Sequence, residues 1–122
     1  MKRTIPILLF SLAAALGGCS KPLPGTEPLT GGDPRQGQQL LERYGCAACH
    51  RIKGIANANS RVGPSLEDIR DGGYVGGVLP NSADNLVKWI MDPTEVSPRT
   101  AMPDLGVTEA EARDMAAYLY SQ

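Results

Sequence analysis

The chain has 122 residues, a length that indicates a single domain. Its formal net charge of −1 at pH 7 argues against a nucleic-acid-binding protein, which needs a strongly basic face. With one Phe and one Trp, a domain of this size has little aromatic mass for its core, as expected where a large buried cofactor completes the fold.

The N-terminus has the pattern of an export signal. The basic start Met1–Arg3 precedes an apolar run over residues 5–16 that is too short to span a bilayer comfortably. We therefore expect residues 1–18 to be a signal peptide. Small residues before Cys19 resemble the lipobox of bacterial lipoproteins, in which the cysteine carries lipid after cleavage. The alternatives are cleavage that leaves Cys19 a free thiol, and an uncleaved membrane anchor.

Residues 19–32 have the composition of a flexible, lipid-anchored tether. Their prolines and glycines exclude a helix or a central strand. An extended segment of this length reaches roughly 40 Å, which would let a small domain swing above a membrane surface. The folded domain is then expected over residues 33–122.

The first predicted helix follows Asp33, a favourable N-cap. Pro34 suits the first helical position, and Gln36 would complete a capping box. Gly45 ends the helix. The residues that fall on its apolar face are Gly37, Leu40, Leu41 and Tyr44.

The rest of the domain is predicted to contain two further helices and loops, without strands of note. Glycines break residues 51–81 into a loop with a short helical turn at residues 65–69. A helix capped by Ser82 runs to about Met91, and an extended loop spans residues 94–105. A capping box at Thr108 opens a last helix to about Tyr120. The fold class is therefore all-α.

Residues 46–50 carry the chemistry. Cys46-Ala47-Ala48-Cys49-His50 is C-x-x-C-H, the attachment motif of haem c. Each thiol can add to one vinyl group on the haem edge, and the histidine that follows then ligates the iron. His50 is the only histidine in the chain. The motif predicts one covalent haem c held by Cys46 and Cys49, with iron ligated by His50.

Three different kinds of site also use paired cysteines, and each fits this sequence less well. A C-x-x-C redox site needs a βαβ setting, for which the sequence shows no strands. A structural zinc site needs four ligands and would have to recruit a carboxylate. A disulfide between Cys46 and Cys49 leaves the adjacent histidine unexplained. The export signal favours haem, because bacterial haem c attachment occurs outside the cytoplasm.

From Asp33 to Ser121 the chain resembles class I cytochrome c, which implies about four short helices wrapped round one covalent haem. Gly37 and Leu41 resemble first-helix positions that cross the last helix at Met115 and Tyr118. The run from Gly63 to Leu66 resembles the family's Gly-Pro-x-Leu loop. There the proline carbonyl, here that of Pro64, accepts the proton of the proximal histidine and raises its basicity.

Met102 is the predicted sixth ligand of the iron. Thr100-Ala101-Met102 resembles the family's segment bearing the distal ligand, and Met102 lies between two prolines. Met115 lies on the predicted last helix, where core packing explains it, and Met91, which ends a predicted helix, is interpreted as core or as lining of the haem pocket. A His/Met pair raises the reduction potential and fills both axial positions, which disfavours binding of oxygen or peroxide.

Further residues are predicted to line the haem pocket or the surface round it. Trp89 takes a position that an aromatic residue usually holds against the haem. The candidates for hydrogen bonds to haem propionates are Thr100, Trp89, Arg70 and Tyr74, the last two being equally compatible with a solvated loop. The residues of a candidate basic docking rim are Arg43, Arg51, Lys53 and Arg61. An ordinary charged surface is the alternative for that rim.

The resemblance implies a one-electron carrier on the periplasmic side of a bacterial membrane, and neither an enzyme nor a binder of small-molecule substrates. Its donor would be a quinol-oxidising complex or a dehydrogenase, and its acceptor a terminal oxidase, a peroxidase or a reductase. One alternative is a fixed haem c subunit of a larger oxidase, reductase or dehydrogenase complex. Another is a gas-binding haem sensor or enzyme with an open distal site, in which Met102 would not bind iron.

Overall fold

The computed structural model describes residues 23–122, so the predicted signal peptide and Cys19 lie outside the described residues. The described part is all-α, as predicted, with one small hairpin. The elements in chain order are α1 (Pro34–Arg43), a 3₁₀ turn (Cys46–Ala48), a second 3₁₀ turn (Ile69–Asp71), β1 (Tyr74–Val75), β2 (Leu79–Pro80), α2 (Ala83–Met91), α3 (Pro93–Val96) and α4 (Glu109–Tyr120).

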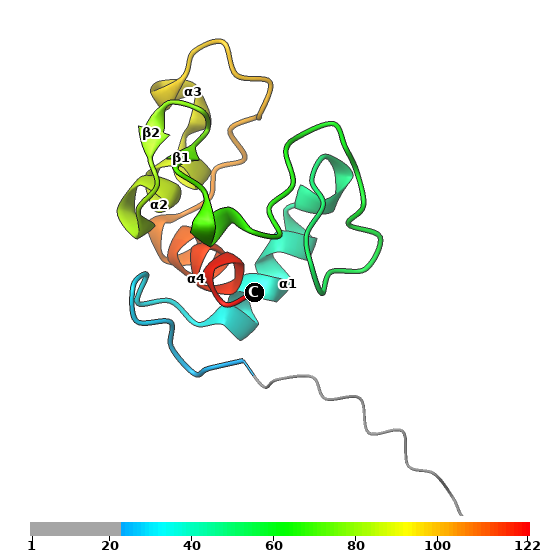
Figure 1. The fold of residues 1–122 in the computed structure, drawn as a ribbon, viewed down its shortest axis with the longest axis vertical. Helices are drawn as coiled ribbons and strands as arrows, with labels where there is room; N and C mark the ends of the chain where they lie inside the picture. The colour runs from blue at the N-terminus through cyan, green and yellow to red at the C-terminus, as the bar shows by residue number, and fades with distance from the viewer. Residues whose placement is uncertain (1–22) are drawn as a thin grey trace, which may run out of the picture.

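Helices α1 and α4 cross at one end of the molecule, and the remaining segments rise from this pair (Figure 1). The crossing is close because Gly37 has no side chain: a Cβ atom there would overlap the backbone carbonyl of Asp114. The segment that begins with Cys46 lies on one side of the crossing, and α2, α3 and the hairpin lie on the other (Figure 1).

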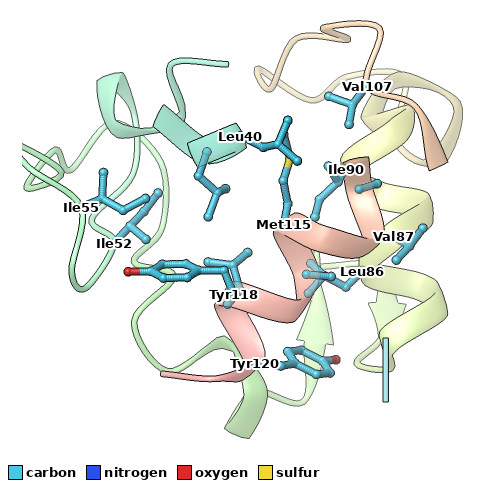
Figure 2. Packing of buried hydrophobic residues seen from close by; sticks show 14 of the residues in the cluster. Leu40, Ile52, Ile55, Leu86, Val87, Ile90, Val107, Met115, Tyr118 and Tyr120 are labelled. Atoms are coloured by element: carbon cyan, nitrogen blue, oxygen red, sulfur yellow. The ribbon is translucent and has the colours of Figure 1, made fainter. Parts of the chain in front are cut away.

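The apolar core gathers round α4. Figure 2 shows the side chain of Met115 pointing toward Leu40 of α1 and Ile90 of α2, so that α4 joins the two sides of the molecule. Tyr118 extends toward Ile52, and its hydroxyl donates to the Lys53 carbonyl at 2.8 Å. These contacts fix the loop that follows the C-x-x-C-H motif against the last helix.

The ends of the longer helices follow the predicted capping signals. The Thr108 hydroxyl and the Glu111 carboxylate form the capping box of α4, and Ser82 caps α2. The capping box predicted for α1 does not form: Asp33 accepts from the Arg35 N–H, while its own N–H donates to the Asp114 carboxylate at 2.7 Å. A tertiary contact therefore replaces the expected bond from Gln36.

Two predicted loop regions contain regular structure that was not expected from the sequence. Pro93–Val96 form α3, because Asp92 accepts from the Glu95 N–H at 2.8 Å and Pro93 takes the first helical position. The predicted turn at residues 65–69 lies instead at Ile69–Asp71. Strands β1 and β2 pair antiparallel, Tyr74 with Pro80 and Val75 with Leu79.

Residues 27–32, the last part of the tether predicted for residues 19–32, are ordered against the domain. The Glu27 carboxylate, only 3 % exposed, accepts from the N–H groups of Leu29 and Thr30 at 3.0 and 2.8 Å. Arg113 of α4 donates to the Thr30 carbonyl at 3.2 Å. Residues 27–32 therefore form a strap packed on α4, because a buried carboxylate organises a turn that composition alone describes as flexible.

Candidate functional site

The segment Cys46–His50 is held in a tight turn directly after α1. Gly45 ends the helix with a φ of 72°, which favours glycine, and the N–H groups of Cys49 and His50 both donate to the Cys46 carbonyl. Both thiols are free and half-buried, so no disulfide joins them. Burial raises the pKa of the Cys46 thiol, which keeps it protonated at neutral pH.

The imidazole of His50 is oriented by Pro64. Its Nδ1 lies 2.7 Å from the Pro64 carbonyl oxygen, which can only accept, so Nδ1 donates and the neutral ring would have its lone pair on Nε2. The structure thus contains the hydrogen bond that the family resemblance implies. A neutral imidazole with one nitrogen bound to a carbonyl is the usual state of a metal-ligating histidine.

Gly63 forms a cradle for the same ring. A Cβ atom on Gly63 would lie 2.5 Å from His50 Cε1 and 2.8 Å from Nδ1. The Gly63 N–H donates to the Cys49 carbonyl at 2.7 Å, which fastens the Gly63–Pro64 segment to the C-x-x-C-H turn. The histidine is therefore positioned by its own turn and by a loop that only glycine can bring this close.

Met102 lies on the loop between α3 and α4 (Figure 1). The Thr100 N–H donates to the Ser97 carbonyl at 2.9 Å, and the Thr100 hydroxyl oxygen accepts from the Met102 N–H at 3.1 Å. The Met102 side chain is half-buried. Thr100, predicted as a haem-pocket residue, thus shapes the backbone that carries the methionine.

The other predicted pocket residues have different surroundings. Trp89 is half-buried against the core. Arg70 donates to the Tyr120 carbonyl at 2.9 Å, and Tyr74 is 68 % exposed. Arg70 therefore binds the end of α4. Tyr74 is exposed to solvent, as the alternative of a solvated loop predicts.

Half of the candidate basic rim is paired with carboxylates. Arg43 lies 3.9 Å from Glu111, and Arg51 lies 2.9 Å from Glu67. Lys53 and Arg61 form no ion pair within the described range. A carboxylate close to an arginine partly cancels its positive potential. The positive potential of the rim is therefore weaker than four unpaired basic residues would give.

No group of three or more His, Cys, Asp or Glu side chains among residues 23–122 is arranged to hold a metal ion. A hollow of about 380 Å³ lies between α2 and α4, lined by Met91 and several charged side chains, and contains none of the predicted haem residues. No helix in this part of the chain is long and apolar enough to cross a bilayer.

The residues present fit a covalent haem c. They supply two free thiols, one imidazole whose Nε2 is available, and a thioether on a separate loop, which are the donor types that hold haem iron in cytochromes c. Two close approaches were not predicted: that of Gly76 to Trp89, where a Cβ atom would lie 2.5 Å from the indole, and that of Gly63 to His50. The hairpin that contains Gly76 could have been predicted, since Gly-Gly between apolar β-forming residues is typical of a hairpin turn.

Comparison with known proteins relates the chain to cytochromes c. The family model for cytochrome c matches residues 34–122. Cytochrome c oxidase subunit 2 of Alkalihalophilus pseudofirmus is 31 % identical over 87 residues, which cover 70 % of this chain and 25 % of that protein. The same subunit of Bacillus sp. (strain PS3) is 29 % identical over 91 residues, covering 71 % and 25 %. The chain spans about a quarter of the length of these relatives.

Proposed function

The chain belongs to the cytochrome c family, and we propose that it passes single electrons through one haem c between redox proteins at the surface of a bacterial membrane. The family itself implies haem-based electron transfer. The haem would supply an iron that alternates between ferrous and ferric states. The chain's own residues would hold it rigidly, which limits the rearrangement that accompanies each change of oxidation state.

Each site residue has a distinct part in this proposal. Cys46 and Cys49 would bind the haem covalently, and His50 and Met102 would ligate its iron. The observation that carries the proposal is the bond from His50 Nδ1 to the Pro64 carbonyl at 2.7 Å. It holds the histidine in the tautomer whose Nε2 can bind iron, and it raises the basicity of that nitrogen. If both His50 and Met102 ligated the iron, no position would be open to a substrate, and we expect electron transfer without substrate chemistry.

A spectrum and a voltammogram test this role. The protein matured with its haem should show the absorption of a haem joined by two thioether bonds, one haem per chain, and a reversible one-electron wave. Reduced protein should not bind carbon monoxide readily. Ready binding would favour the sensor or open-site enzyme and would contradict the electron-transfer proposal.

The similarity to oxidase subunit 2 supports a terminal oxidase as the redox partner, and it favours a fixed subunit as the second candidate. The two candidates differ in how the protein is recovered. A carrier should separate from the oxidase after gentle detergent extraction and should exchange electrons with it at a rate that rises with concentration. A subunit should instead co-purify with the oxidase in a fixed ratio.

Attachment through a lipid on Cys19 is the proposed means of holding the protein at the membrane, on its periplasmic side. Support comes from the small residues before Cys19 at the end of a short apolar run. The variant Cys19→Ser should appear in the soluble periplasmic fraction, with an unchanged haem spectrum. If that variant stays with the membrane, the lipid anchor is excluded as the sole attachment.

A further inference from the structure

The turn of the β1–β2 hairpin consists of two glycines, and one of them lies against Trp89. Gly76 and Gly77 have φ values of 58° and 73°, as a type I′ turn requires at its two central residues. The turn is closed by the Val78 N–H, which donates to the Val75 carbonyl at 3.1 Å. Val75 itself is 2 % exposed and belongs to the core, so the turn has a firm base.

The two glycines differ sharply in what lies next to them. A Cβ atom on Gly76 would lie 2.5 to 2.7 Å from Cζ3, Cε3 and Cη2 of the Trp89 indole. A Cβ atom on Gly77 would have no heavy atom within 4 Å. The backbone of Gly76 therefore lies directly against the six-membered ring of Trp89, while Gly77 faces open space.

The position of Trp89 depends on the groups packed round it. The side chain is partly buried against the core, and the backbone of Gly76 lies against its six-membered ring. The surface of Gly76 therefore limits where the indole can lie.

We propose that Gly76 is a positioning residue for electron transfer: the backbone of its turn packs against the Trp89 indole and holds it beside the haem. This inference rests on the proposed function for the haem, and on the predicted contact of Trp89 with it. An alanine at position 76 would push the indole, because the hairpin is tied to the core. The displaced ring would admit water to the cofactor and lower its reduction potential, since a wetter site favours the more highly charged ferric state.

The matched pair Gly76→Ala and Gly77→Ala tests the proposal in the haem-loaded protein. Both variants place alanine at a positive φ, so both carry the same kind of backbone strain. Only Gly76→Ala should lower the reduction potential and change the fluorescence of Trp89, the single tryptophan of the chain. Equal changes in the two variants would show backbone strain alone and would overturn the proposal.

A double-mutant cycle supplies the second readout. Phenylalanine at position 89 lacks the outer atoms that a Cβ on Gly76 would meet, so Gly76→Ala should shift the potential much less in the Trp89→Phe background. An equal shift in both backgrounds would overturn the proposal. A parent protein without a reversible one-electron wave would overturn the proposed function instead, while the fluorescence of the two alanine variants would still decide whether Gly76 positions Trp89.

Discussion

The Gly37 Cα of α1 lies so close to the Asp114 carbonyl of α4 that no side chain fits between the two helices. The first and last helices of the domain are thereby joined, and the strap formed by residues 27–32 continues the contact: a Cβ atom on Gly32 would meet the backbone of Arg113. The loop that follows α1 and the loop that precedes α4 contain the candidate haem ligands, so the crossing of these helices fixes where the first loop begins and where the second ends (Figure 1).

Replacing Gly37 with alanine should destabilise the protein. In an unobstructed helix interior this change is favourable by about 1 kcal/mol, whereas forcing an extra carbon into a packed contact costs about 1–3 kcal/mol or more. We expect a net loss, measured by denaturant unfolding. Gly25→Ala is the control, because nothing lies within 4 Å of its Cβ position. Equal stability of both variants would contradict the close crossing.

Gly63→Ala should disturb the candidate proximal ligand. The added methyl group would press on Cε1 and Nδ1 of His50 and would strain the bond to the Pro64 carbonyl. We expect a higher reduction potential, because a less basic imidazole stabilises ferric iron less, and a loss of about 1–3 kcal/mol in stability. Gly73→Ala has nothing within 4 Å of its Cβ position and should change neither quantity. An unaltered potential in the Gly63 variant would argue against the cradle.

Met102→Ala tests the sixth ligand. The oxidised protein should lose the weak red absorption band that reports an iron–sulfur bond, its potential should fall, and its reduced form should bind carbon monoxide. Met91→Ala is the control, because Met91 lies on α2 and lines a hollow that His50 and Met102 do not line. A spectrum of the Met102 variant identical to the parent would refute the assignment.

Acid should weaken the anchoring of α4 through Glu111. Bonds from the Thr108 N–H and hydroxyl, and from the Tyr44 hydroxyl, hold the pKa of Glu111 below its ordinary value of 4.5. Because the folded-state pKa is lowered, this stabilisation is complete above about pH 4.5 and is lost as the pH falls further.

The variant Glu111→Gln should therefore be less stable than the parent at neutral pH, and the difference should shrink in acid. Urea unfolding at about pH 7 and about pH 3.5 measures both differences. Glu42→Gln removes an exposed carboxylate that forms no ion pair in the described part of the chain, and it should leave the pH dependence unchanged. A difference for Glu111→Gln that is the same at both pH values would contradict the lowered pKa.

Glu27→Ala should release the strap. The N–H groups of Leu29 and Thr30 would lose a shared carboxylate oxygen in a buried position, at a cost of about 1–3 kcal/mol. Amide hydrogen exchange at these two residues should accelerate strongly. Glu67→Ala breaks an exposed pair with Arg51 and should cost no more than about 1 kcal/mol. Unchanged exchange at Thr30 would mean that residues 27–32 behave as the predicted tether.

Local sequence signals were sufficient where bonds form between near neighbours. The capping box of Thr108 and Glu111, the Ser82 cap and the Gly45 stop all act within one helical turn, so the bounds of α2 and α4 and the end of α1 were predictable. Cys46, Cys49 and His50 could also be identified from the sequence, because they lie within five consecutive residues. One short turn can then present two thiols and an imidazole to one cofactor.

Only the tertiary structure decided the contacts between distant residues. The replacement of the Gln36 bond by Asp114, the packing of the strap under Arg113, and the approach of Gly76 to Trp89 join residues that no local pattern relates. The sequence by itself therefore determined which donor atoms the protein offers, because their chemistry and spacing are local. The fold decided how rigidly they are held, because that depends on where two helices cross and which glycines let segments meet.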